Sequence, residues 1–424
     1  SLIIALDCGI KAIDKVNYAK EKGIDFIICD HHRPGNEIPD AVAVLDPKRA
    51  DCEYPYKELC GCGVGFKLIQ ALASKRNKTI DDLVPYLDLV ATAIAADIVP
   101  ITGENRILAY FGLQVINSNP RNGIKAMIHQ IKKKELNITD VVFIIAPRIN
   151  AAGRIKHGNY AVELLTELDF DSAVKFALEI EQNNNDRKDL DKLITSEALL
   201  QIEENKEQYN YSTVVYAENW HKGVIGIVAS RLIETHYKPT LVFTKSGDKL
   251  AASARSVKGF DVYEALEQCS EFIEQFGGHK YAAGLTLKEE NYQNFKNKFE
   301  EVVKNTLLEE LRTPEIAIDA EISLSEITPK FFRIMNQLSP FGPQNMKPVF
   351  MCGGLRDNGY GKKVGSDETH LKLNLFEGTN QTTYNAIGFG MGDKHEINQN
   401  KIVFKVDFHI NEKQRNGYKT FMFL

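Results

Sequence analysis

The fold is decided by two stretches, LIIALDCG (residues 2–9) and DFIICDHH (residues 25–32). Each is a short run of β-branched and other apolar residues that ends in an aspartate, the pattern of a buried strand in a parallel sheet. Between them, residues 11–22 have the apolar spacing of a helix, which Gly23 closes. A strand, a helix and a second strand within about 30 residues predict a parallel α/β sheet.

The rest of the chain divides into further units. Helical spacing recurs in three segments up to residue 116, and a long helix from about Asp171 to Asn205 is expected to connect domains. A second α/β unit is expected from the strand Thr213–Tyr216 to the helix Glu290–Thr306. After Pro314, short alternating strands with glycine-rich turns predict a small β-barrel.

The composition is that of a globular protein of several domains, with 43% hydrophobic and 26% charged residues in 424. No apolar run approaches the ~18 residues that cross a bilayer, so we expect no membrane contact. We also expect no signal peptide, because the first apolar run ends at Asp7. Seven scattered cysteines predict reduced thiols and a cytoplasmic location. The net charge of −5 argues against strong nonspecific affinity for nucleic acid.

Acids and imidazoles follow the two predicted strands. Asp7 ends the first strand, and Asp30, His31 and His32 follow the second. Because ligands gather at the carboxyl ends of parallel strands, these side chains are expected to converge. Carboxylates suit Mn²⁺ or Mg²⁺, and the imidazole favours Mn²⁺. Asp97, which follows an apolar helical run, is the third candidate acid. The simpler alternative is that the two histidines only cap a turn.

Two segments carry guanidinium or hydroxyl groups that bind phosphate. Arg148, Asn150 and Arg154 lie in one run, and guanidinium groups match the geometry of a phosphate. Ordinary surface arginine is the alternative there. The second segment ends a predicted strand, where its side chains can reach an oxyanion. It consists of Ser253, Arg255 and Ser256.

Two glycine-containing segments are expected to precede helices, whose N-termini bind anions. Gly278 and His279 belong to one of them, for which simple turn geometry is the alternative. Trp220 and His221 belong to the other, before the expected helix Gly226–Thr235. Trp220 is either a platform for a base or a core anchor.

The order of these motifs resembles the DHH phosphoesterase superfamily. Three successive motifs carry this resemblance: DCG (residues 7–9), DHH (residues 30–32) and ADIVP (residues 96–100). Further matches resemble one branch, the RecJ single-stranded-DNA exonucleases. They are LCGCGV (59–64), PRINAAGR (147–154), WHKGVIG (220–226), SARS (253–256), GGHKYAAG (277–284) and FGPQN (341–345). The resemblance covers nearly the whole chain.

The resemblance implies a role for each residue of the strand ends. Asp7 would bridge two metal ions, Mn²⁺ or Mg²⁺, while His31 and Asp97 would ligate one of them. Asp30 would orient His31, and His32 would face the scissile phosphate. Residues 253–256 would help to read the 5′ end.

The resemblance also implies an architecture. A DHH domain with a parallel sheet is expected first, then a connecting helix, a second α/β (DHH-associated) substrate-binding domain and a C-terminal OB-fold β-barrel. Their expected boundaries are 1–170, 171–207, 208–311 and 312–424. The family's first motif, an Asp-x-Asp pair on an earlier strand, does not precede residue 2. This departure leaves open whether these 424 residues are active by themselves.

The function that the resemblance implies is 5′→3′ hydrolysis of single-stranded DNA in DNA repair and recombination. A monomer is expected, with a helicase or a single-strand-binding protein as a further partner. One alternative is a phosphodiesterase for short oligonucleotides or cyclic dinucleotides, but such relatives lack a barrel like that expected after Pro314. Another is a non-catalytic scaffold for single strands, against which the intact acids and histidines argue.

Overall fold

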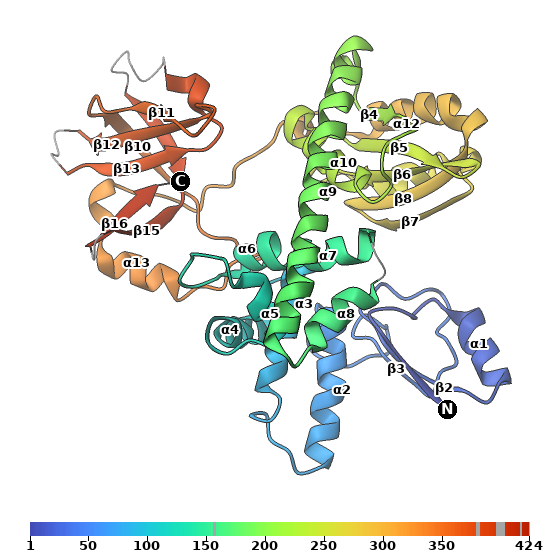
Figure 1. The fold of residues 1–424 in the computed structure, drawn as a ribbon. Coiled ribbons are helices and arrows are strands. Elements are labelled where there is room, and N and C mark those ends of the chain that lie inside the picture. Colours follow the sequence, from blue (N-terminus) through green and yellow to red (C-terminus); the bar gives the residue numbers. More distant parts are fainter. Residues whose placement is uncertain (156–157, 379–381, 396–402, 416–417, 424) are drawn as a thin grey trace. The chain divides into compact units, whose positions relative to one another are not determined.

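The computed structural model describes residues 1–424 except 156–157, 379–381, 396–402, 416–417 and 424 (Figure 1). The side chains of residues 152–155, 404 and 411–423 are also outside this description. The chain forms two compact units. The first unit comprises residues 1–121, 131–146 and 316–424, and the second comprises residues 122–130 and 147–315.

The first unit begins with the predicted parallel sheet. Its strands pair in the order β1 (Leu2–Leu6), β2 (Asp25–Cys29) and β3 (Ala43–Leu45), with α1 (Ile13–Glu21) between the first two. The side chains of β2 become more buried toward its carboxyl end, while those of β1, at the edge of the sheet, stay mostly exposed. The parallel register brings the carboxyl ends of β1 and β2 to the same edge.

Three long helices follow, α2 (Gly61–Lys75), α3 (Leu87–Ala96) and α4 (Gly103–Ser118). The apolar spacing of residues 81–95 predicts a helix from Asp81, but α3 starts later, because Pro85 lies in a 3-10 turn, η1 (Val84–Tyr86), before it. α3 packs closely on α4, and a short helical segment, α6 (Ile138–Asp140) with the π-helical η2 (Val141–Ile145), covers it. Ala91 and Ile94 of α3 are fully buried, which fits its largely apolar sequence.

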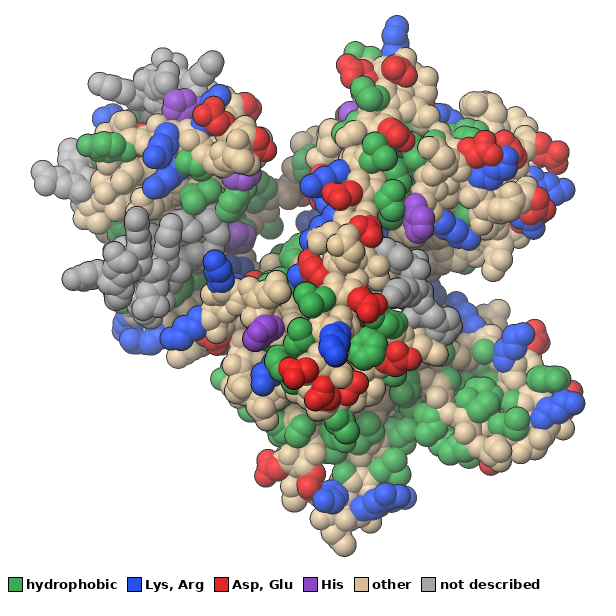
Figure 2. Space-filling model, viewed as in Figure 1, with side chains coloured by type: hydrophobic (Ala, Val, Ile, Leu, Met, Phe, Trp, Pro, Cys, Tyr) green, Lys and Arg blue, Asp and Glu red, His purple; other side chains and the backbone are tan. Residues whose placement is uncertain are grey.

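The second unit contains the predicted long helix, α9 (Phe170–Glu204), of 35 residues. Three shorter helices precede it: α5 (Asn122–Ile128), α7 (Ala146–Ile155) and α8 (Asn159–Thr166). α9 buries one row of small and branched residues against α5 and α10. Its exposed face carries acidic and basic side chains interspersed (Figure 2), as expected for a solvated helix.

A five-stranded sheet forms the rest of this unit, in the order β4 (Thr213–Tyr216), β5 (Thr240–Ser246), β6 (Lys249–Arg255), β8 (Ala282–Lys288) and β7 (Gln275–His279). Only β4 and β5 pair in parallel. α10 (Ile225–His236) packs on β5 and β6, and α11 (Val262–Glu267) and α12 (Tyr292–Thr306) complete the unit. The core contains Phe243, Phe295 and Phe299, all fully buried. The sequence pattern of Asp261–Gln275 predicts one helix, which is wrong beyond Glu267, where α11 ends.

The C-terminal part of the first unit is an eight-stranded sheet. β14 (Phe404–Phe408), β10 (Phe350–Asp357), β12 (His370–Glu377), β13 (Tyr384–Gly388), β16 (Tyr418–Phe423) and β15 (Ile410–Arg415) pair in that order. β9 (Ala320–Glu321) pairs with β10, and β11 (Lys362–Val364) pairs with β12. No pairing between the described strands closes this sheet into a ring. The helix α13 (Pro329–Asn336) was not expected from the sequence.

The remaining regular elements are short 3-10 turns. They are η3 (Glu207–Tyr209), η4 (Ser270–Phe272), η5 (Glu289–Asn291), η6 (Glu309–Arg312), η7 (Leu324–Glu326) and η8 (Gly392–Lys394). Among the described residues, no helix combines the length and apolar character needed to span a membrane.

Candidate metal centre and phosphate pocket

Asp7 occupies a position that the local backbone makes unusual. Its φ is +62°, in the left-handed region that few residues other than glycine adopt. The first residue of α2, Gly61, lies so close that a Cβ there would come within 2.1 Å of Asp7 Oδ1, so only glycine fits. The N-terminus of a helix favours negative charge. The sequence therefore places a carboxylate at the carboxyl end of β1, against the N-terminus of α2.

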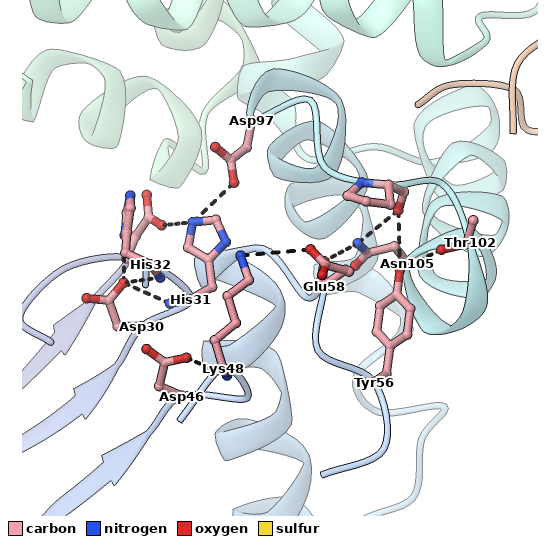
Figure 3. A network of polar contacts seen from close by, with 12 residues as sticks. Asp30, His31, His32, Asp46, Lys48, Tyr56, Glu58, Asp97, Thr102 and Asn105 are labelled. Atoms are coloured by element: carbon pink, nitrogen blue, oxygen red, sulfur yellow. Dashed lines mark hydrogen bonds and ion pairs between the residues drawn. The ribbon is translucent and has the colours of Figure 1, made fainter. Parts of the chain in front are cut away.

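The buried ring of His31 contacts both candidate acids. Its Nε2 atom lies 3.2 Å from Asp7 Oδ1 and 3.3 Å from Asp97 Oδ2 (Figure 3). Burial lowers the pKa of His31, but the hydrogen bond to Asp7 and the charges of Asp97 and Asp7 outweigh it, so the pKa is raised above its usual 6.5. Burial raises the pKa of Asp97. The three predicted ligands therefore converge on one point.

This geometry fits a divalent cation. Neighbouring ligands of an octahedral ion with bonds of about 2.1 Å lie about 3 Å apart, close to the two distances observed here. Asp7, His31 and His32 also offer ligand atoms that all lie within 4.8 Å of one another. No other atom among the described residues makes a hydrogen bond to the ring nitrogens of His31. Two carboxylates and an imidazole suit Mn²⁺ or Mg²⁺.

Asp30 orients a different ring from the one expected. Its carboxylate accepts hydrogen bonds from the Nδ1 atom of His32 at 2.7 Å and from the backbone N–H groups of Ile10 and His31, at 2.9 and 2.8 Å. Burial raises the pKa of Asp30, but these hydrogen bonds outweigh it and lower the pKa. The expectation that Asp30 orients the ring of His31 is therefore wrong, because its carboxylate holds His32 instead.

Two residues near the centre were missed by the sequence reasoning. Asp46 follows β3 as Asp7 and Asp30 follow their strands, so the same signal could have found it. It is 2% exposed, and burial raises its pKa. Lys48 extends from the next turn toward the centre, and its Nζ lies 3.8 Å from a carboxylate oxygen of Glu58 (Figure 3). Its positive charge acts on the carboxyl of Asp97 and on the ring of His31.

In the second unit, Arg255 and Ser253 line a cavity of about 430 Å³. The guanidinium Nη1 of Arg255 donates to Ser253 Oγ at 3.1 Å. Gly226, near the N-terminus of α10, closes another side, and a Cβ there would come within 3.0 Å of both side chains. Lys222 also lines the cavity. A guanidinium, an ammonium, a hydroxyl and a helix N-terminus around one cavity are the groups with which proteins bind phosphate-sized anions.

Two of the other predicted substrate-binding residues serve the local backbone. Ser256 does not line this cavity, since its hydroxyl donates to the carbonyl of Phe260 at 3.0 Å. The Nδ1 atom of His221 accepts from the N–H of Gly223 at 3.1 Å.

Gly278 and His279 lie in strand β7, not in a loop before a helix, so that prediction was wrong. The glycine pair allows β7 and β8 to approach closely. A Cβ at Gly278, whose φ is +150°, would come within 2.4 Å of the carbonyl oxygen of Ala282.

Trp220 is a core residue. It is 4% exposed, and its indole N–H donates to Glu197 at 2.7 Å, so the ring is not available to a base and its predicted role in substrate binding is not supported. Arg148 lies in α7, where its Nε contacts a carboxylate oxygen of Glu181 at 2.5 Å. Asn150 is exposed on the same helix, and the side chain of Arg154 lies outside the described residues.

Comparison with family models agrees with this architecture. Residues 1–94 match the DHH family, N-terminal domain, residues 207–305 match the DHHA1 domain, and residues 318–424 match the RecJ OB domain. The DHH match contains the candidate ligands at the ends of β1 and β2. The RecJ OB match contains the C-terminal sheet. Fold and site together define a protein of the DHH class.

Curated relatives narrow this class. The single-stranded-DNA-specific exonuclease RecJ of Haemophilus influenzae is 32% identical over 98% of this chain and 75% of its own length. The RecJ of Bacillus subtilis is 38% identical over 97% of this chain and 52% of its own length. The chain belongs to the RecJ exonuclease family. It spans only about half to two thirds of the length of the first curated relatives that it matches.

A solved structure gives the same result. The crystal structure of RecJ in complex with Mn²⁺ from Thermus thermophilus superposes with a TM-score of 0.85 at 26% identity, over 100% of this chain and 60% of that one. The same protein has been solved with Mg²⁺, with a TM-score of 0.79. This relative has therefore been solved with each of the two metals, Mn²⁺ and Mg²⁺, that the donor set of this chain suits.

Proposed function

We propose that this chain carries the nuclease centre of a metal-dependent 5′→3′ exonuclease that hydrolyses single-stranded DNA. The observation that carries the proposal is the convergence of Asp7, His31 and Asp97. A carboxylate oxygen of each aspartate lies within 3.3 Å of the Nε2 atom of His31. Held by these three residues, a divalent ion would supply Lewis acidity for the hydrolysis of a phosphodiester.

The chain's own residues then orient the substrate. Asp30, held ionised by its hydrogen bonds, fixes the Nδ1 atom of His32 as a donor toward Asp30. We propose that the ring of His32, aligned in this way, faces the scissile phosphate. Lys48 adds a positive charge beside the centre, which favours the approach of a phosphodiester.

The cavity around Arg255 and Ser253 supports recognition of the strand's end. A terminal 5′-phosphate carries more negative charge than an internal phosphodiester, and a guanidinium with a hydroxyl binds it through several donors. We propose that this cavity holds the 5′ end. The substrate-binding role predicted for Arg148 and Asn150 of α7 is a separate part of the proposal, and Arg148 is paired with Glu181.

The C-terminal sheet offers a surface for a single strand. Phe389, directly after β13, is 62% exposed and contacts the ring of His370 with centroids 5.2 Å apart. Lys362 and Lys372 are direct neighbours across β11 and β12. Exposed rings beside lysines are the features with which OB domains stack bases and hold a backbone. This surface favours single-stranded DNA over a dinucleotide as substrate.

The ligand set of these residues is that of one ion. Two ions, as the resemblance implies, need further carboxylates, which the family's Asp-x-Asp motif supplies. We therefore propose that the chain binds one divalent ion by itself and that full hydrolysis requires that motif. A monomer, and a helicase or a single-strand-binding protein as partner, belong to the same proposal.

The test uses the chain joined to an N-terminal segment that carries the family's Asp-x-Asp motif. With Mn²⁺ we expect release of mononucleotides from 5′-phosphorylated single-stranded DNA and little from duplex. Asp97→Asn should abolish this release, and Asp393→Asn, on the exposed η8 turn, is the matched control. Equal digestion of duplex, digestion in the presence of chelator, or a preference for dinucleotides would contradict the proposal.

A further inference from the structure

The residues that follow Asp97 adopt a conformation that their sequence does not favour. Asp97 ends α3, where its backbone N–H donates to the carbonyl of Ala93 at 2.9 Å. The next residue, Ile98, has a φ of +56°. For a β-branched side chain this left-handed conformation is an outlier, which persists only where the surrounding structure imposes it.

Two side chains near the centre hold one part of this segment. The carbonyl of Pro100 accepts a hydrogen bond from the Nδ2 atom of Asn105 at 3.1 Å and from the hydroxyl of Tyr56 at 3.3 Å (Figure 3). Asn105 is fully buried, and its amide also donates to the carbonyl of Glu58. The segment is therefore fixed at Pro100 by residues of α4 and of the loop before α2.

The third support comes from the C-terminal part of the same unit. The backbone N–H of Ile101 donates to the carbonyl of Pro343 at 2.8 Å. Ile101 is fully buried, and a Cβ at Gly342 would come within 2.4 Å of its Cγ1 atom. Gly342 and Asn345 close this turn with reciprocal backbone hydrogen bonds of 3.0 and 2.9 Å.

A second contact anchors the same turn. Arg106 of α4 donates through Nη2 to the carbonyls of Gln337 and Ser339, at 3.0 and 3.2 Å. The amide of Asn345 in turn donates to the carbonyls of Leu338 and Pro340. The segment 337–345 is thus joined by hydrogen bonds to Arg106 in the first turn of α4 and to Ile101, two residues before that helix.

We propose that the segment 337–345 is a positioning element for Asp97. By holding Ile101, it keeps Ile98 in its left-handed conformation and the carboxylate of Asp97 within reach of His31. The segment that leads into the C-terminal sheet is thereby coupled to the candidate metal centre through the backbone. This inference rests on the proposed function, because it takes Asp97 to be a metal ligand.

Gly342→Ala in the full chain tests the proposal, because the added Cβ must displace Ile101. We expect the amide of Ile101 to exchange with deuterium at least about tenfold faster without metal, and Mn²⁺, measured by the electron paramagnetic resonance of the free ion, to bind about tenfold more weakly. Gly353→Ala, in β10 of the same sheet, is the matched control, since its new Cβ would meet nothing closer than 3.5 Å. It should change neither quantity.

Two further variants keep the test decisive. Ile101→Ala combined with Gly342→Ala removes the clashing Cγ1 atom and should restore Mn²⁺ binding at least in part. Arg106→Gln, which removes two hydrogen bonds without adding bulk, should weaken Mn²⁺ binding in the same direction if Gly342→Ala does not fold. Mn²⁺ binding that is unchanged while Ile101 exchanges faster would overturn the positioning role alone. A wild-type chain that binds no Mn²⁺ would instead refute the proposed function.

Discussion

The carboxylate of Asp30 holds the Nδ1 atom of His32 at 2.7 Å, while the neighbouring ring of His31 points its Nε2 atom at Asp7 and Asp97. Two adjacent histidines therefore have separate tasks. In the proposed function His31 would be a metal ligand, whereas His32 is aligned by the carboxylate of Asp30.

Asp30→Asn and Asp97→Asn should differ in what they impair. Asp97→Asn removes a proposed ligand, so we expect Mn²⁺ affinity to fall by more than the about 10- to 100-fold that is typical when a residue behind a ligand is replaced. Asp30→Asn keeps the ligands and weakens only the alignment of His32, so Mn²⁺ affinity should change by less than about threefold. Isothermal titration with Mn²⁺ measures both. Similar losses in the two variants would show that Asp30 acts on the ligand set.

The raised pKa of His31 predicts opposite pH trends with and without metal. In the metal-free chain the imidazolium between Asp7 and Asp97 stabilises the fold below the unfolded pKa of about 6.5, and this contribution is lost as the pH rises through the higher folded pKa. Mn²⁺ requires the neutral ring, so its stabilising effect should grow over the same range.

The measurement is the melting temperature at pH 6 and pH 8, with and without Mn²⁺. The increase in Tm on adding Mn²⁺ should be larger at pH 8, and His31→Gln should remove the difference. An increase of the same size at both pH values would mean that His31 does not exchange its proton for the ion.

Arg255→Gln should weaken recognition of a 5′-phosphate. A hydrogen bond to a charged group contributes about 1.5–3 kcal/mol, so binding of a 5′-phosphorylated oligonucleotide should weaken about 10- to 100-fold. Arg312→Gln removes an arginine that pairs with Glu309 on η6 and serves as the control. Fluorescence anisotropy with 5′-phosphate and 5′-hydroxyl oligonucleotides separates a loss of recognition of the terminal phosphate from a general loss of affinity for the strand. If both oligonucleotides lose the same affinity, the cavity does not read the terminal phosphate.

Phe389→Ala should lower the affinity of the C-terminal sheet for single strands. Base stacking on a ring contributes about 1–3 kcal/mol, so a loss of about 5- to 100-fold is expected. Phe389→Trp retains an aromatic surface and should bind like the wild type. Filter binding of oligothymidine at two salt concentrations checks this. Full affinity in the alanine variant would assign the strand to another surface.

Arg121→Ala should destabilise the first unit without a direct effect on metal binding. Asp88 is fully buried in α3 and accepts hydrogen bonds from the backbone N–H and guanidinium of Arg121, at 2.8 to 3.0 Å. Removing the guanidinium leaves a buried carboxylate without its ion-pair partner, which costs about 3–5 kcal/mol. Arg121→Ala with Asp88→Leu should recover much of this loss in urea denaturation. If the free energy of unfolding of Arg121→Ala changed by less than about 1 kcal/mol, Arg121 would not be the partner that stabilises the buried carboxylate of Asp88.

The strands and the convergence of Asp7 with His31 could be predicted because their signals are local. Runs of apolar residues ending in Asp7 and Asp30 identify buried parallel strands, and parallel pairing alone brings those ends together. Gly278 was misjudged because a glycine pair reads equally well as a loop or as a place where two strands approach closely. The contact of Ile101 with Pro343 has no sequence signal, since the two residues are 242 positions apart and joined through their backbones.

The left-handed backbone at Ile98 has a consequence for engineering this chain. Glycine or asparagine would relieve the unfavourable conformation, so a screen for higher melting temperature would tend to select them there. Glycine would also increase the number of conformations available to the adjoining Asp97, whose carboxylate would then lose conformational entropy when an ion binds. At this one position, a substitution that raises the melting temperature would therefore lower the affinity for the cation.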